Sequence, residues 1–143
     1  EVNFYSQHYE GGYAWYTSHF DAEKVMVDTS PKYFMLGADV APRIHETLGA
    51  RPPGFILILR NPVDYVASHF QMHLRRGYFK RHPETYPERI GNLAKFIDRY
   101  PAYLDRARYA HILEMSWFSY FRREQFLIVF FTKGNSQRTG IRH

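Results

Sequence analysis

One short segment limits the choice of fold more than any other part of the sequence. Residues 55–59 (Phe-Ile-Leu-Ile-Leu) are apolar at every position, and Arg-Asn-Pro follows at residues 60–62. A strand without polar alternation has both faces covered, as in a parallel sheet between layers of helices. Asn is a common helix cap, and Pro is a common first helical residue. The sequence therefore predicts a buried strand that leads directly into a helix.

The predicted helix continues to about Arg75. Its apolar residues recur at spacings of three and four, which is the pattern of a stripe that faces the core. These residues are Val63, Val66, Phe70 and Leu74.

Two further helices and a second strand complete the pattern. Residues 90–100 and 103–118 are predicted helices separated by Pro101, and residues 126–131 form a second apolar run. Strand, helix, helical excursion and strand in this order are typical of an α/β fold. We therefore expect residues 55–59 and 126–131 to be interior, parallel strands of one sheet.

The remaining segments give weaker signals. The predictions are a strand end at 2–5, a helix at 13–20, a buried strand at 25–27, a turn at 28–31, a helix at 42–48 capped by Gly49, and a surface loop at 77–87. Residues 1–131 are expected to form the central part of one domain. Residues 132–143 are expected to be a polar tail.

Composition restricts the chemistry. The chain has 143 residues, no cysteine and a net charge of +5 at pH 7. Without cysteine there is no disulfide framework, no cysteine-ligated zinc and no thiol nucleophile. No apolar run approaches the roughly 20 residues of a transmembrane helix, so we expect no membrane segment. A basic surface favours anionic partners such as nucleotides, sulfated or carboxylated glycans, nucleic acid or anionic lipid.

Arg60 stands at the predicted junction of strand and helix. Ligands of open α/β sheets bind beyond the carboxyl ends of the strands, and a helix start offers free N–H groups to an anion. A guanidinium matches a phosphate group in shape and charge. Arg60 is therefore a candidate phosphate ligand. The alternatives are that its side chain only extends from the strand end to water, or that it pairs with Asp64.

Three other patterns have structural alternatives. His69 and His73 lie four residues apart on the predicted helix, but no third ligand accompanies them, so we expect no metal site. Residues 75–82 interleave basic and aromatic side chains, which fits either a nucleic-acid or glycan clamp or a solvated basic loop. Residues 28–34 place an acid, hydroxyls and a cation after a predicted strand, and the alternative there is a local turn.

Several segments together resemble the sulfotransferase domain of the heparan sulfate sulfotransferases. The matching blocks are, in chain order, residues 1–5, 8–16, 28–34, 41–44, 57–64 with 68–70, and 109–113 with 117 and 121. They cover nearly the whole chain up to about Phe131. The resemblance implies an α/β parallel-sheet sulfotransferase fold, which is a P-loop-like nucleotide-binding fold, incomplete at both ends of this chain.

The resemblance also implies roles for individual residues. Arg60 and Ser68 fall on the positions that bind the 3′-phosphate of the co-substrate, 3′-phosphoadenosine 5′-phosphosulfate. Glu1 falls on the position of the general base. Thr29 stands where the heparan enzymes usually have a catalytic Lys, and Lys32, three residues later, is the candidate replacement. No metal is implied.

The implied reaction transfers a sulfuryl group to a hydroxyl or amine of an acceptor, with an anionic polysaccharide such as heparan sulfate as the expected partner. No nucleic-acid partner is expected. The implied location is the Golgi lumen, or the cytoplasm for a bacterial protein. The 5′-phosphosulfate loop of the family is expected just upstream of Glu1, so we expect this chain to be an internal piece that is inactive alone. A kinase-like nucleotide-binding domain and a non-enzymatic polyanion-binding module remain as alternatives.

Overall fold

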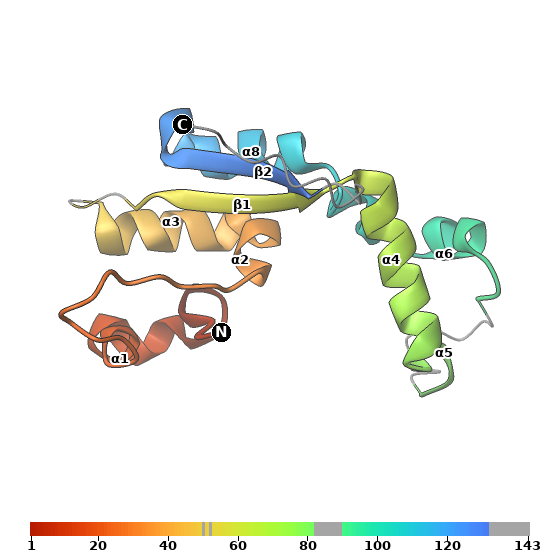
Figure 1. The fold of residues 1–143 in the computed structure, drawn as a ribbon, viewed down its shortest axis with the longest axis horizontal. Helices are drawn as coiled ribbons and strands as arrows, with labels where there is room; N and C mark the ends of the chain where they lie inside the picture. The colour runs from red at the N-terminus through yellow and green to blue at the C-terminus, as the bar shows by residue number, and fades with distance from the viewer. Residues whose placement is uncertain (50, 52, 82–89, 132–143) are drawn as a thin grey trace, which may run out of the picture. The chain divides into compact units, whose positions relative to one another are not determined.

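The computed structural model describes residues 1–49, 51, 53–81 and 90–131 (Figure 1). The chain forms two compact units. The first unit consists of Glu1–Phe55 and Arg108–Phe126, and the second consists of Ile56–Ala107 together with the residues from Leu127 onward. The predicted tail at 132–143 and most of the predicted loop at 77–87 lie outside the described residues.

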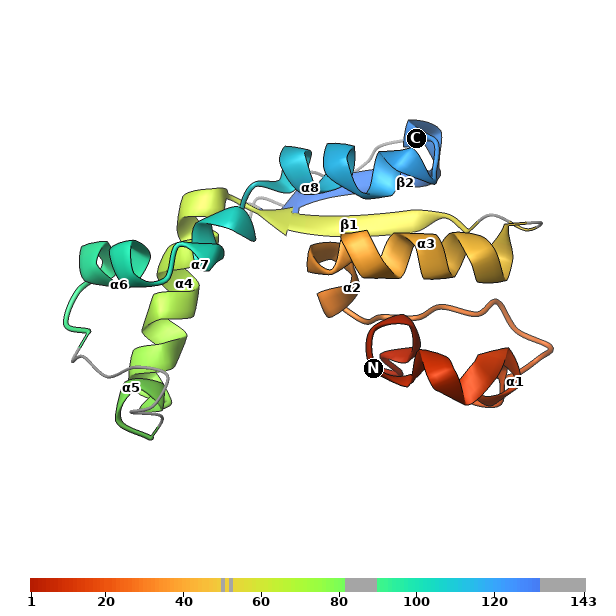
Figure 2. The same ribbon diagram turned by 180° about the vertical axis from the view of Figure 1, so that it is seen from behind.

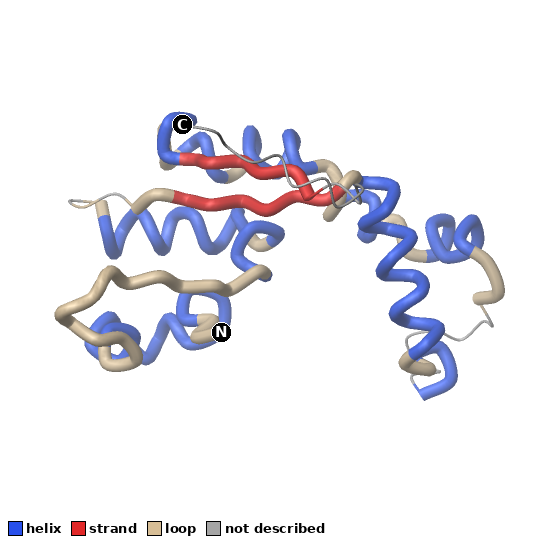
Figure 3. Tube along the Cα trace, viewed as in Figure 1, coloured by secondary structure: helices blue, strands red, loops and turns tan. Residues whose placement is uncertain are grey.

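The first unit is built from short helices, shown in blue in Figure 3. Its elements are a π-helical turn at Phe4–His8, a 3₁₀ turn at Tyr9–Gly11, α1 (Gly12–Thr17), α2 (Lys32–Met35), α3 (Gly37–Leu48), α8 (Tyr109–Met115) and 3₁₀ turns at Trp117–Ser119 and Arg123–Gln125. The helix predicted at 13–20 is confirmed as α1, although α1 ends three residues earlier.

Aromatic rings form the core of the first unit. Phe4, Tyr5 and Tyr16 are all buried, and the rings of Phe4 and Tyr16 stack with their centroids 4.5 Å apart. The indole Nε1 of Trp117 donates a hydrogen bond to the carbonyl oxygen of Phe34 at 3.1 Å. A side chain in place of Gly37 would collide with this indole, so close packing requires glycine there.

Two predictions for the first unit are wrong, the strand at 25–27 and the strand end at 2–5. Residues 25–27 have no regular structure, and Val25 is 91% exposed. Residues 2–5 lead into the π-helical turn that begins at Phe4. An apolar tripeptide does not become a strand unless a neighbouring strand supplies its hydrogen bonds, and none does so here among the described residues.

Helix α3 is longer than predicted. It begins at Gly37, five residues before Pro42, which therefore lies inside the helix rather than in its first turn. The buried residues Val40, Ala41 and Ile44 lie on one face of α3 and hold it against the core. Gly49 follows the helix as predicted, but its φ of −51° is right-handed.

The second unit contains the sheet and the longest helix. Strands β1 (Phe55–Arg60) and β2 (Phe126–Phe131), which both begin at the boundary with the first unit, are hydrogen-bonded to each other and run parallel. Between them in sequence are α4 (Pro62–Arg75), α5 (Tyr78–Arg81), α6 (Leu93–Arg99) and α7 (Ala102–Asp105). The predicted positions of both strands and of α4 are confirmed.

The prediction that both faces of these strands are covered is wrong. Leu59 is buried, but Ile56 and Ile58 on the opposite face of β1 are 69% and 72% exposed. All five residues from Leu127 to Phe131 are also exposed. Alternate side chains of a strand point to opposite faces, and no described element of the second unit covers the face that carries Ile56 and Ile58.

Helix α4 packs on a small core. The buried residues of this core are Val66, Phe70, Ile90, Phe96 and Ala107. The predicted stripe on α4 is correct at its two central positions and wrong at its ends, because Val63 and Leu74 are exposed. His73 is buried in their place.

The helices predicted at 90–100 and 103–118 are shorter in the structure. The prediction of 90–100 corresponds to α6, and the prediction of 103–118 is wrong because that segment is interrupted. Its first part is α7, and its second part is α8, which follows the non-helical Arg108 (φ −85°, ψ 63°). One of the points where the chain passes from one unit to the other falls at this interruption, between Ala107 and Arg108.

Among the described residues, no helix is both long and apolar enough to cross a membrane.

The Phe96 side chain is expected to be the main apolar anchor of the second unit. Phe96 is fully buried, and its ring lies 4.7 Å from that of Tyr103 and 5.5 Å from that of Phe70. Phe96→Ala should lower the free energy of unfolding by about 3–5 kcal/mol. The matched control is Phe130→Ala, because Phe130 is 65% exposed, and this change should stay within about 0.5 kcal/mol. Urea unfolding of both variants tests this, and equal losses would contradict the assigned core.

Candidate anion site at the junction of β1 and α4

The site begins with the cap of α4. The side-chain Oδ1 of Asn61 accepts hydrogen bonds from the backbone N–H groups of Val63 (2.9 Å) and Asp64 (3.4 Å). Pro62 is the first helical residue and has no N–H to satisfy. The strand therefore passes into the helix through one residue, which places the last side chain of β1 beside the first turns of α4.

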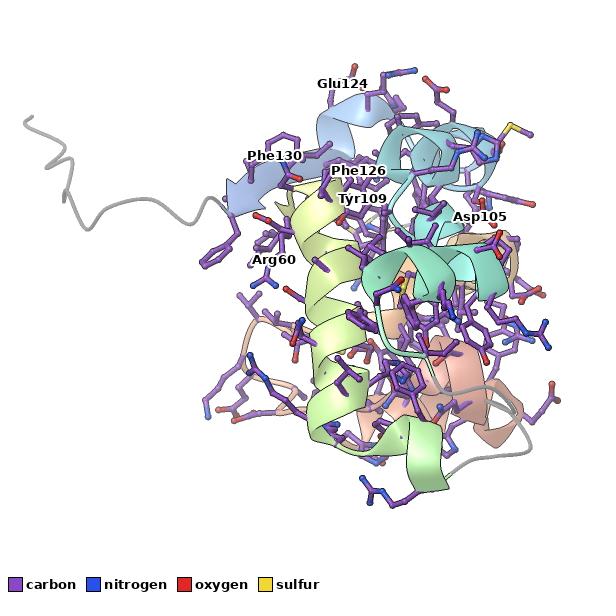
Figure 4. The ribbon with its side chains drawn as sticks, turned by 90° about the vertical axis from the view of Figure 1, so that its right-hand side faces the viewer. Arg60, Asp105, Tyr109, Glu124, Phe126 and Phe130 are labelled. Carbon is purple, nitrogen blue, oxygen red and sulfur yellow. The ribbon has the colours of Figure 1, made fainter. Side chains whose placement is uncertain are left out.

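Arg60 and Ser68 meet at this junction. The Nη1 of Arg60 donates a hydrogen bond to the Oγ of Ser68 at 2.7 Å. The guanidinium also lies over the ring of Phe131, 5.5 Å from its centroid. Figure 4 shows Arg60 at the end of its strand, next to α4. The two residues that the sulfotransferase resemblance selects for one phosphate are thus in direct contact.

One alternative role of Arg60, an ion pair with Asp64, does not occur. Both residues are described, and no ion pair joins them. Within the described part of the chain, Arg60 has no carboxylate partner. Arg60 is half-buried, and its guanidinium has further N–H donors besides the one that Ser68 accepts.

A group of aromatic and basic side chains lies around His69, the residue that follows Ser68. The His69 ring lies 4.5 Å from that of Tyr65 and 5.6 Å from that of Tyr103. The guanidinium of Arg106 lies over the Tyr103 ring at 4.9 Å. Burial lowers the pKa of His69 below its ordinary value, and the positive charges of Arg106 and Arg60 lower it further.

His73 is the buried polar residue of α4. Its Nε2 is 2.9 Å from the hydroxyl of Tyr103, so the two groups share a hydrogen bond. Burial lowers the pKa of His73, and the charges of His69 and Arg106 act in the same direction. Among the described residues, no group of three His, Cys, Asp or Glu side chains could hold a metal ion.

Glu1 and Lys32 belong to the first unit. Glu1 is exposed at the start of the chain, and Lys32 is exposed at the start of α2. Neither side chain forms a hydrogen bond or ion pair with another described residue. The structure therefore brings together Arg60 and Ser68, and it does not bring Glu1 into contact with Lys32.

Residues 28–30 have no regular structure, and the Asp28 carboxylate there accepts side-chain hydrogen bonds. The Oδ1 of Asp28 accepts a hydrogen bond from the Oγ of Ser30 at 2.6 Å. Its Oδ2 accepts hydrogen bonds from the hydroxyls of Tyr33 (2.8 Å) and Tyr16 (3.2 Å). Burial is the main cause that raises the pKa of Tyr33 to about 12. Asp28 thus ties α1 to α2.

The basic–aromatic segment at 75–82 forms local contacts as far as it is described. Arg81 donates a hydrogen bond to the carbonyl oxygen of Arg76, and its guanidinium lies over the Tyr78 ring at 5.6 Å.

A separate cavity of about 330 Å³ lies in the first unit. It is lined by Phe4, Tyr9, Gly12, Tyr13, Glu46 and Thr47. None of the four predicted site residues lines it.

Sequence patterns did not predict that His69, Tyr103 and Arg106 lie together. The spacing of His69 and His73 fits only a metal-ligand pattern, which lacks a third ligand in the sequence, and Arg106 has no motif around it. Only the packing of α7 against α4 brings Arg106 to this place.

Comparison with family models, with curated proteins and with solved structures finds no match to this chain.

The lowered pKa values of His69 and His73 predict that acid destabilises the second unit. The ordinary pKa of His is 6.5. As the pH falls below that value, the unfolded chain binds protons that the folded histidines do not, so the free energy of unfolding decreases. Urea unfolding between about pH 8 and about pH 5 measures this effect.

The double variant His69→Gln, His73→Gln is the control for this experiment. Its free energy of unfolding should depend less steeply on pH over the same range. A slope equal to that of the unchanged chain would show that these two histidines do not carry the effect.

Proposed function

We propose that this chain belongs to a sulfotransferase that uses 3′-phosphoadenosine 5′-phosphosulfate, and that Arg60 and Ser68 bind the 3′-phosphate of this co-substrate. The observation that carries the proposal is the hydrogen bond between the Arg60 guanidinium and the Ser68 hydroxyl at the carboxyl end of β1. These are the two residues that the resemblance assigns to that phosphate, and they lie eight positions apart in sequence.

The chemistry of this pair suits a phosphate group. A guanidinium offers parallel N–H donors and a permanent positive charge to phosphate oxygens. The Ser68 hydroxyl accepts from Arg60, which leaves its own hydrogen free to point toward an anion. The position beyond the carboxyl end of a parallel strand is where α/β proteins bind nucleotides.

The proposed reaction requires little covalent chemistry from the protein. Sulfuryl transfer, like phosphoryl transfer, depends on positioning and on stabilising charge. The residues of this chain would hold the 3′-phosphate at one end of the co-substrate and accept a proton from the acceptor hydroxyl or amine. We propose Glu1 for the proton and an anionic polysaccharide as the acceptor, which agrees with the net charge of +5.

Arg60→Ala should weaken the binding of adenosine 3′,5′-bisphosphate by about 10–150-fold, the equivalent of about 1.5–3 kcal/mol for a charged hydrogen bond. Ser68→Ala should have a smaller effect of about 2–10-fold, because its hydrogen bond is uncharged on one side. Isothermal titration calorimetry of the whole chain measures both.

Arg123→Ala is the matched control for Arg60. Arg123 also holds its guanidinium over a phenylalanine ring, that of Phe118 at 4.3 Å, but it belongs to the first unit. Its removal takes away the same charge and the same kind of contact, and affinity should not change. Equal losses for Arg60→Ala and Arg123→Ala would indicate non-specific attraction of a polyanion and contradict the proposed site.

Glu1→Gln should lower turnover by about 10²–10⁴-fold, the usual scale of general-base catalysis, with little change in co-substrate affinity. The glutamine keeps the size of the side chain but cannot take up the proton. Steady-state kinetics of the full-length protein, with the affinity for adenosine 3′,5′-bisphosphate measured in parallel, provides the test. Normal turnover would remove Glu1 from the mechanism, and a loss of affinity of the same size would assign it a structural role.

A further inference from the structure

We propose that the cavity of the first unit binds an uncharged sugar ring, whose apolar face packs on tyrosine rings and whose hydroxyl groups donate hydrogen bonds to Glu46 and Thr47. The cavity has a volume of about 330 Å³. Cavities of roughly 300–1,000 Å³ with aromatic walls and a few polar groups are the usual sites of small-molecule binding. Arg60 and Ser68 belong to the other unit, so this inference does not depend on the proposed co-substrate.

Two segments that are distant in sequence line the cavity. Glu46 and Thr47 lie in the last turn of α3, and Gly12 and Tyr13 begin α1. Figure 2 shows α1 and the turns before it on one side of α3. A methyl group at Gly12 would meet no atom within 4 Å beyond its chain neighbours and its own helix, so the space above the start of α1 is open.

Aromatic packing holds one wall of the cavity in place. Phe4 is buried, and its ring stacks on that of Tyr16 at 4.5 Å and lies 5.5 Å from that of Tyr9. Tyr13 is 43% exposed, and its ring lies 5.9 Å from that of Tyr16. Because these rings already pack on one another, they offer apolar area to a ligand at little cost in conformational entropy.

The polar groups of the cavity are acceptors whose own hydrogens are already used. The hydroxyl of Tyr9 donates to the Oε2 of Glu46 at 2.9 Å and lies 3.5 Å from the hydroxyl of Thr47. The Thr47 hydroxyl donates to the carbonyl oxygen of Arg43 at 2.6 Å. The Glu46 carboxylate and the Thr47 oxygen keep further lone pairs. The cavity therefore suits a ligand that donates hydrogen bonds.

Two opposite charges meet at Tyr9, which favours an uncharged ligand. Its hydroxyl binds the Glu46 carboxylate, and its ring lies 5.0 Å from the guanidinium of Arg43, three residues earlier in α3. Neither charged group forms an ion pair with another described residue. The carboxylate disfavours an anion, and the guanidinium disfavours a cation. A sugar ring has an apolar face and donates hydrogen bonds without carrying a charge, so it meets all these conditions.

Nuclear magnetic resonance on the isotope-labelled whole chain tests the inference with three probes, the methyl glycosides of glucose, galactose and mannose. At least one probe should shift the amide signals of Gly12 and Thr47 in a saturable way and leave the signal of Ser68 unchanged. A dissociation constant on the order of 1 mM is expected for a ligand of this size. If none of the three shifts these signals at concentrations well above that value, the inference is overturned.

The uronic acid and the amino sugar of the same configuration, each in its charged form, test the argument from charge. Both should bind about fivefold more weakly than the neutral glycoside, which is the effect of one unit charge at about 4 Å in water. Equal or tighter binding of the amino sugar would assign the cavity to a cation. Equal or tighter binding of the uronic acid would assign it to an anion, and either result would overturn the inference.

Glu46→Gln keeps the size of the side chain and removes its charge. It should weaken the binding of the neutral glycoside about fivefold, because an amide oxygen is a weaker acceptor than a carboxylate. It should also remove most of the difference in affinity between the neutral glycoside and the uronic acid. A purely structural role of Glu46 would leave that difference unchanged, and this outcome would contradict the proposed contact.

Tyr13→Ala should weaken the binding of the glycoside about 2–10-fold. Tyr120→Ala is the matched control, since Tyr120 is 41% exposed in the same unit and does not line the cavity. Its affinity should not change, and equal losses in the two variants would overturn the inference. Binding of adenosine 3′,5′-bisphosphate should be the same in all these variants, so the sugar site and the proposed co-substrate site can fail separately.

Discussion

The passage from β1 into α4 is the constraint on which the candidate site depends. Asn61 is the only residue between strand and helix, and its side chain binds the N–H groups of Val63 and Asp64. Because the connection is so short, Arg60 at the end of the strand lies along the first turns of the helix. There its guanidinium donates a hydrogen bond to Ser68. A longer loop would not hold Arg60 beside α4. The position of this candidate ligand therefore depends on the length of the connection between strand and helix.

The distribution of charge in the second unit also favours anion binding at this place. A protein stabilised for folding alone would pair its half-buried guanidiniums with carboxylates, because unbalanced charge near apolar surface costs free energy. Here Arg60, which is half-buried, lacks such a partner among the described residues, and burial and nearby positive charge lower the pKa of His69. We interpret this imbalance as stability given up for anion binding, which is a common compromise at functional sites.

Sequence patterns predicted the parts of the structure that local interactions decide. The strand at 55–59 and the helix from Pro62 to Arg75 are confirmed because an apolar run and a cap act within a few residues. The strand at 25–27 failed because a strand needs a partner that its own sequence cannot supply. Spacing alone did not select Ser68, which came from the family resemblance, and no pattern selected Arg106, because packing between α7 and α4 decides where it lies.

We propose that the carboxyl end of β1 recognises a 3′-phosphate. The most direct test of this proposal compares two nucleotides that differ only in that group, adenosine 3′,5′-bisphosphate and adenosine 5′-phosphate, by calorimetric titration of the whole chain. We expect the bisphosphate to bind at least about tenfold more tightly, since one charged hydrogen bond to the 3′-phosphate is worth about 1.5–3 kcal/mol. Equal affinities, or tighter binding of adenosine 5′-phosphate, would contradict the proposal.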